Sequence, residues 1–320
     1  MTHPLTLFEG EEAYVQDIKL TRLDPYAHLA VLVATFVVAT SFPIGQRIAP
    51  FLDPVLVVLL RFLISILVMS PFLFFTDMIK IPTGRRLLQF GAVGGAQAGF
   101  FILMFLALQH TSSLNTSVIY TLLPSLAAIM GFYLLKERLR PLHLVLLPIG
   151  ILATAWVIFE GSFEKMVGLD LNPGDLIFGA GLLLLALYSV LLKKFHLGGS
   201  PFDMVFWSMA CAIVPMALYS VSRFGSIEFE SVPLDVYLWI VYLALMTVFT
   251  NFVWAFGTPR LGPMKTMAYS YLIPSFVLFI NWIIMGTLPP VIVLPGVLVG
   301  FFIMFVLQFG KNVVGEKSNA

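Results

Sequence analysis

Several polar and aromatic side chains of this sequence lie within long apolar stretches, where they are the groups best able to bind a solute. An amide both donates and accepts hydrogen bonds, and a tyrosine or tryptophan adds an aromatic face. Such groups are costly inside a membrane and usually face a cavity or a partner helix. This set suits a neutral or zwitterionic solute, and the candidate substrate-binding residues are Gln97, Phe101, Tyr120, Asn251, Trp254, Tyr269 and Ser270.

Three other features have two readings each. Arg61 is the one charged residue inside an apolar stretch, and it is either a lock between helices or an anchor for an anion or carboxylate. Glu137 is either half of a surface salt bridge or a proton-coupling or gating carboxylate. Pro124 and Pro274 interrupt backbone hydrogen bonding, so they either act as hinges or bends that shape the cavity, or are static kinks.

The sequence offers no chemistry typical of an enzyme. It contains no His-Glu-x-x-His motif, no paired carboxylates within an apolar stretch and no nucleotide-binding loop. We therefore expect no catalytic residue, no metal and no cofactor. Acidic residues are missing from the middle of the apolar stretches, which weakens carboxylate-based proton or sodium coupling and a strongly cationic substrate.

The composition indicates an integral membrane protein. Of 320 residues, 59 % are hydrophobic and 11 % are charged, and the mean hydropathy is +0.97. So few charges cannot cover the surface of a soluble domain of this size. A net charge of +1 gives no reason to expect nucleic acid, and one cysteine, Cys211, excludes an internal disulfide. We expect a multi-pass protein of the plasma membrane, in bacteria the inner membrane.

The apolar stretches predict ten transmembrane helices. Two uncharged stretches, 87–135 and 266–310, are long enough for two helices each, and each divides at a polar or Pro-Pro turn. The other six are 25–46, 54–76, 141–159, 176–192, 204–222 and 236–259. Placing the N-terminus in the cytoplasm puts 14 of the 18 Lys and Arg residues inside and 3 outside, so both termini are predicted to be cytoplasmic.

An internal repeat divides the chain into two halves. Thr116, Leu122, Pro124, Ser125 and Gly150 recur 150 residues later as Thr266, Leu272, Pro274, Ser275 and Gly300. Five helices per half is an odd number, so the second copy would enter the membrane from the opposite side, as in many secondary transporters. The predicted boundaries are 1–24 for a cytoplasmic segment, 25–160 and 174–310 for the repeats, 161–173 for an external linker and 311–320 for a cytoplasmic tail.

The chain resembles the EamA family of the drug/metabolite transporter superfamily. The residues that carry the resemblance are Leu-Leu-Arg-Phe-Leu at 59–63, Leu-Leu-Pro-Ser at 122–125, Leu-Leu-Lys-Glu-Arg-Leu at 134–139, Pro-Ile-Gly-Ile-Leu at 148–152 and Gly-Asp-Leu at 174–176. The chain departs from the family pattern at Thr40-Ser41 and at Gly286-Thr287. The resemblance implies a ten-helix fold with a cavity lined by spans 1, 3, 4, 6, 8 and 9, and export of metabolites such as amino acids.

The expected function is therefore secondary transport of a small neutral or zwitterionic metabolite by alternating access around a central cavity. The direction, export, follows from the resemblance alone. A membrane-embedded enzyme acting on a lipid-like substrate and a solute channel remain alternatives. The expected partners are a small-molecule metabolite and the lipid bilayer, and a homodimer is one open option.

Overall fold

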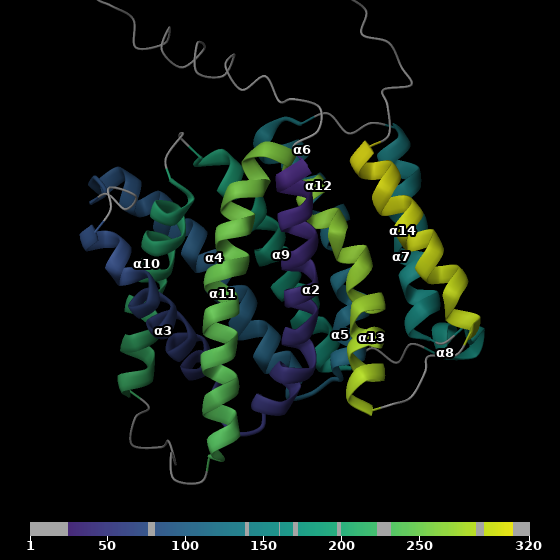
Figure 1. Ribbon diagram of the computed structural model, residues 1–320, viewed down its shortest axis with the longest axis horizontal. Coiled ribbons are helices and arrows are strands. Elements are labelled where there is room, and N and C mark those ends of the chain that lie inside the picture. Colours follow the sequence, from purple (N-terminus) through teal and green to yellow (C-terminus); the bar gives the residue numbers. More distant parts are fainter. Residues whose placement is uncertain are drawn as a thin grey trace, which may run out of the picture.

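The protein forms a bundle of helices in a computed structural model. The structure describes residues 25–75, 81–137, 141–159, 161–168, 172–196, 200–222, 232–285 and 291–309, and these residues form helices, turns and connections without a β-strand. The predicted cytoplasmic segments 1–24 and 311–320 and the turn at 286–290 lie outside the described residues. Most of the longer helices run side by side, roughly vertically in Figure 1.

In the described ranges, six helices are long and apolar enough to cross a membrane. They are α2 (Pro25–Ile48), α3 (Pro54–Phe75), α4 (Gly84–Leu108), α9 (Pro173–Lys194), α10 (Pro201–Ser222) and α11 (Leu234–Leu261). The remaining helices are shorter and include α7 (Pro141–Ile158), α8 (Phe163–Val167), η4 (Val291–Val293) and α14 (Leu294–Phe309). The chain is thus an all-helical protein with multiple apolar spans.

Two of the predicted spans are broken helices. One consists of α5 (Ser113–Tyr120) and α6 (Leu123–Leu135), and the other of α12 (Pro263–Ala268), η3 (Tyr269–Leu272) and α13 (Ile273–Met285). Pro124 has no N–H to donate to the carbonyl of Tyr120 four residues earlier, and Pro274 stands in the same relation to Ser270. The breaks therefore fall where the prolines remove a helical hydrogen bond.

The contacts between helices repeat when the two halves are exchanged. Helix α4 packs on α9 as α11 packs on α2, and α10 packs on α4 as α3 packs on α11. The pair α3 and α10 and the pair α7 and α14 are each their own counterpart. In Figure 1, α2, α9 and α11 stand near the middle of the bundle, between α3 and α10 on one side and α7 and α14 on the other.

Small residues let α4 and α10 come into close contact. A Cβ atom added to Gly94 would overlap the backbone carbonyl of Ser208, so only glycine fits this crossing. Small residues at helix contacts are typical of membrane proteins, because they allow backbones to approach closely. Gly94 therefore seats α10 against α4, whereas the neighbouring Gly95 faces open space.

Candidate functional site

Two small cavities lie one after the other in the centre of the bundle. We call the first the Arg61 cavity; it is lined by Val38, Ser41, Phe42, Arg61, Phe100, Phe101, Met104, Tyr120, Met246, Thr247, Thr250 and Trp254. We call the second the Ser270 cavity; it is lined by Thr35, Val38, Tyr120, Leu123, Trp254, Thr266, Met267, Ser270 and Ile273. Both are therefore built from helices of both halves.

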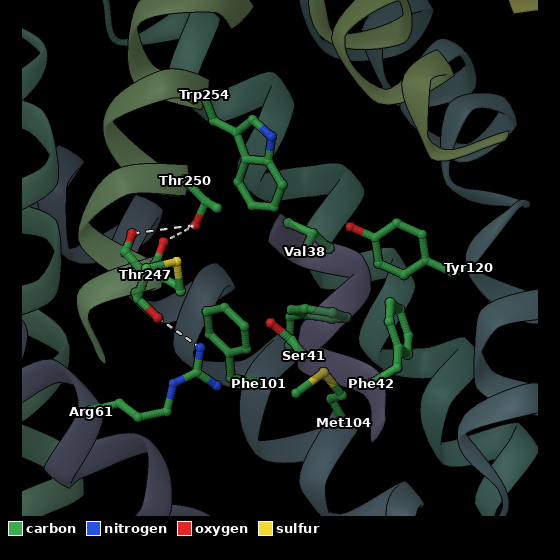
Figure 2. Close-up of a pocket in the computed structure, with 12 residues that line it drawn as sticks. Val38, Ser41, Phe42, Arg61, Phe101, Met104, Tyr120, Thr247, Thr250 and Trp254 are labelled. Carbon is green, nitrogen blue, oxygen red and sulfur yellow. Dashed lines mark hydrogen bonds between the residues drawn. The ribbon is translucent and has the colours of Figure 1, made fainter. Parts of the chain in front are cut away.

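Tyr120, Trp254 and Val38 line both cavities and so form the wall between them. Tyr120 is the last residue of α5, directly before the break at Pro124, and Trp254 lies on α11. Figure 2 shows the two rings on opposite sides of Val38. A shift at the α5–α6 break would therefore move part of the wall.

Both cavities are small in this conformation. The space for the centre of a water-sized sphere is about 20 Å³ in the Arg61 cavity and about 10 Å³ in the Ser270 cavity. A water molecule needs at least about 10–15 Å³ by this measure. The first cavity is therefore large enough for a water molecule, whereas an organic solute enters only if the walls move apart.

Several polar atoms at the cavities have no hydrogen-bond partner among the described residues. The hydroxyls of Ser41 and Tyr120 and the indole N–H of Trp254 line the Arg61 cavity, and no hydrogen bond joins them to any described residue. The Oγ atom of Ser270 is buried and also lacks a partner. Because polar groups in an apolar interior are normally paired, these atoms are available to a bound solute or water.

Arg61 is the charged residue of the Arg61 cavity and is 2 % exposed. Its Nη2 atom donates a hydrogen bond to Thr247 Oγ1 at 2.7 Å. The guanidinium carbon lies 4.3 Å from the ring centre of Phe101, a cation–π contact. Figure 2 shows the guanidinium between Phe101 and Thr247.

The position of Arg61 differs from what the resemblance implied. Span 2, which corresponds to α3, was expected to lie away from the cavity, but α3 supplies Arg61 to the lining. Helix α9, the counterpart of span 6, supplies no residue to either lining. The side chain does not reach outward to the membrane surface, because it packs inward against Phe101 and α11.

The structure brings four of the predicted substrate-binding residues to the cavities. Phe101, Tyr120 and Trp254 line the Arg61 cavity, and Ser270 lines the Ser270 cavity. Pro124 and Pro274 are absent from both linings but directly follow the helix breaks that place Tyr120 and Ser270.

The other three predicted residues are engaged elsewhere. Gln97 on α4 donates its side-chain amide to Asn251 Oδ1 on α11, and Asn251 Nδ2 lies 3.7 Å from Met209 Sδ. Both amides are almost fully buried and neither lines the two cavities. Tyr269 forms a hydrogen bond of 2.7 Å between its hydroxyl and His28 Nδ1. These residues hold helices together around the site.

Charged pairs tie helices of the two halves at opposite ends of the bundle. Arg47 at the end of α2 contacts Asp235 at the start of α11, with Nη2 and Oδ2 3.2 Å apart. Lys193 near the end of α9 contacts Glu137 just after α6, with Nζ and Oε1 2.6 Å apart.

Sequence reasoning left Ser41 and Thr250 out of the predicted site, and it considered Arg61 only as one of two readings, an anchor for an anion or carboxylate. The repeat contains a signal for one of them, because the 150-residue spacing that relates Tyr120 to Ser270 also relates Phe100 to Thr250 and Met104 to Trp254. All four of these α4 and α11 residues line the Arg61 cavity. For Ser41 and Arg61, the spacing offers no comparable signal.

Comparisons with known proteins match this fold. The sequence model described as the EamA-like transporter family matches residues 25–159 and, separately, residues 172–309. The uncharacterized transporter YyaM of Bacillus subtilis (strain 168) is 28 % identical over 227 residues, covering 69 % of this chain and 74 % of that protein. One crystal structure of a protein superposes with a TM-score of 0.67 and 18 % identity, covering 88 % of this chain and 97 % of the other.

Proposed function

Since this chain belongs to the EamA-like transporter family and is a multi-pass membrane transport protein, we propose that it is a secondary carrier for small organic metabolites. The observation that carries the proposal is the pair of cavities enclosed between the two halves and divided by Tyr120 and Trp254. A carrier needs an enclosed site that opens to one side at a time.

We propose ten transmembrane spans, arranged as two inverted five-helix repeats with both termini in the cytoplasm. The family model matches the chain twice, which supports the duplication. The helix contacts are preserved when the halves are exchanged, as expected for two related units facing each other. The uneven distribution of Lys and Arg supports the cytoplasmic placement of the ends.

The proposed cycle breaks one end of the molecule at a time. Separation of Arg47 from Asp235 opens the Arg61 cavity to the outside, and separation of Lys193 from Glu137 opens the Ser270 cavity to the cytoplasm. The Arg47–Asp235 pair is exposed and the Lys193–Glu137 pair is half-buried. Ion pairs at a protein surface contribute at most about 1 kcal/mol, so the exposed pair opens thermally at little cost and the half-buried pair at a somewhat higher one. The broken helices allow the wall at Tyr120 to move without unfolding a continuous helix.

The proposed substrate is a neutral or zwitterionic metabolite such as an amino acid, and the proposed direction is export. The lining combines hydroxyl groups with aromatic faces and contains no acidic side chain. Phe101, Tyr120, Trp254 and Ser270 are proposed to contact the solute. Gln97, Asn251 and Tyr269 enter the proposed site as the residues that hold its walls.

The test is solute flux in proteoliposomes that contain the purified protein. Thermal-shift screening of an amino-acid and organic-acid panel selects the solute, and radiolabelled solute then reports uptake. A carrier shows saturable uptake that is accelerated by the same solute on the opposite side. Flux that does not saturate would indicate a channel and contradict the proposal.

Two variants connect that flux to the cavity. Tyr120→Phe removes one hydroxyl from the wall and Trp254→Ala removes a ring, so both are expected to raise the half-saturation concentration. Trp239→Ala, which removes an exposed Trp on the same helix α11, is the matched control and should leave uptake unchanged. Unchanged uptake in both wall variants would count against the site.

A further inference from the structure

Arg61 is a buried charge that has no acidic partner among the residues that the structure describes. Its guanidinium is almost completely buried, and no acidic residue lines its cavity. A buried cation in this setting is expensive unless an anion or a set of acceptors compensates it. The aromatic ring of Phe101 and one threonine hydroxyl supply only part of that compensation.

The remaining hydrogen-bonding capacity of Arg61 is unused. Atoms Nε and Nη1 are buried without a partner among the described residues. Thr247, which accepts from Nη2, already donates its own hydroxyl to the carbonyl of Leu243 at 2.6 Å. A role as a lock between α3 and α11 accounts for one nitrogen of the guanidinium and leaves two unexplained.

The surroundings of the guanidinium match a solute with one anionic end and an apolar body. Phe42, Phe101 and Trp254 present rings to the same cavity, while Ser41 and Tyr120 present hydroxyls without protein partners. A carboxylate can accept two N–H groups of one guanidinium, a stronger and more directional contact than a neutral hydrogen bond.

We propose that the Arg61 cavity is a carboxylate site and that Arg61 binds the carboxylate of the transported solute. This inference rests on the proposed carrier function, but it replaces the neutral or zwitterionic substrate with a solute, anionic or zwitterionic, that carries a carboxylate beside an apolar or aromatic body. An amino-acid zwitterion and a monocarboxylate anion share this chemistry. The missing acid in the lining leaves an ammonium group without a counter-charge, so the monocarboxylate binds more tightly.

The first test compares acids with their amides on the purified wild-type protein by isothermal titration calorimetry. Phenylacetate should bind at least about 30-fold more tightly than phenylacetamide, because the amide leaves the buried charge unpaired. L-Phenylalanine should bind more weakly than phenylacetate. Equal affinity for acid and amide, or no binding of either carboxylate, would overturn the inference. Chloride that competes as well as phenylacetate would also overturn it.

The second test removes the charge. Arg61→Met keeps an unbranched side chain of similar reach and should lower phenylacetate affinity at least about 30-fold. Arg85→Met, the matched control, makes the same substitution at an exposed arginine that lines neither cavity and should keep phenylacetate affinity within about threefold. Unchanged phenylacetate affinity in a monodisperse Arg61→Met protein would contradict the inference. If that variant does not fold, the comparison of phenylacetate with phenylacetamide on the wild-type protein decides.

The carboxylate site and the carrier function can be disproved independently of each other. If phenylacetamide and phenylacetate show equal saturable uptake into proteoliposomes, the carboxylate site is wrong while the carrier function stands. If binding is specific for the carboxylate but no solute shows saturable flux, the site stands and the carrier function is wrong.

Discussion

Gln97 on α4 and Asn251 on α11 are hydrogen-bonded to each other through their side-chain amides, although 154 positions separate them in the chain. Both residues are buried and neither lines the Arg61 cavity. Gln97 Oε1 has no hydrogen-bond partner among the described residues. The pair connects corresponding helices of the two halves. The bond therefore couples the packing of one half to that of the other.

We expect this pair to contribute to stability more than to solute binding. Asn251→Leu leaves the amide of Gln97 buried without a partner and should cost about 1–3 kcal/mol in free energy of unfolding. In a double-mutant cycle with Gln97→Leu, the coupling should reach about 0.6–1.7 kcal/mol. The measurement is reversible unfolding in mixed micelles. Additive costs would show that the two amides act independently.

The two end ion pairs should control access to the cavities. Arg47→Gln is expected to increase labelling of Ser41→Cys by a membrane-impermeant maleimide from one face, about two- to fivefold. Glu137→Gln should increase labelling of Ser270→Cys by the same maleimide when it is added to the other face. Both cysteines are placed in a Cys211→Ser background, because Cys211 is the single native thiol. If Arg47→Gln exposes Ser270→Cys from that first face instead, the assignment of ends is wrong.

The prolines at the helix breaks should matter for the rate of transport. Pro124→Ala supplies an N–H for the carbonyl of Tyr120, so α5 and α6 can join into one helix. We expect solute uptake to fall about tenfold or more while the protein remains folded. Pro148→Ala within the unbroken helix α7 is the matched control. Normal uptake by Pro124→Ala would indicate a static kink.

Stability should decrease in mildly acidic solution because of His196. This residue follows the end of α9, and burial, together with the charges of Arg260 and Arg86, lowers its pKa below the ordinary 6.5. The unfolded chain then binds the proton more readily than the folded one. The melting temperature should therefore be constant above about pH 7 and fall as the pH decreases through about 6.5. His196→Gln should reduce this decrease, and an identical pH profile would contradict the assignment.

Much of the helical framework could be read from the sequence. Long apolar stretches with at most one charge predicted the positions of α2, α3, α4, α9, α10 and α11, because length and hydrophobicity largely decide which segments can span a bilayer. The helix breaks near Pro124 and Pro274 follow equally directly from the missing backbone donor. Segment hydrophobicity and proline position are local properties, so a short stretch of sequence is enough to identify them.

The side-chain arrangement was harder to predict. An isolated amide such as Gln97 can be satisfied by a solute or by another amide, and the sequence does not show which partner lies opposite. The direction of Arg61 depends on how α3 packs against α4 and α11, which is a long-range contact. Its place in the lining therefore became visible only once the helices were assembled.

Both end ion pairs, Arg47–Asp235 and Glu137–Lys193, are closed in the same structure. In the proposed cycle of alternating access, this closed form is the occluded intermediate between the inward-open and outward-open states. Because one ion pair closes each end, the two ends are alike in this respect, and neither pair by itself imposes a direction. If the proposed carrier moves its solute without a coupling ion, the solute gradient sets the net direction, and reversing that gradient reverses the flux.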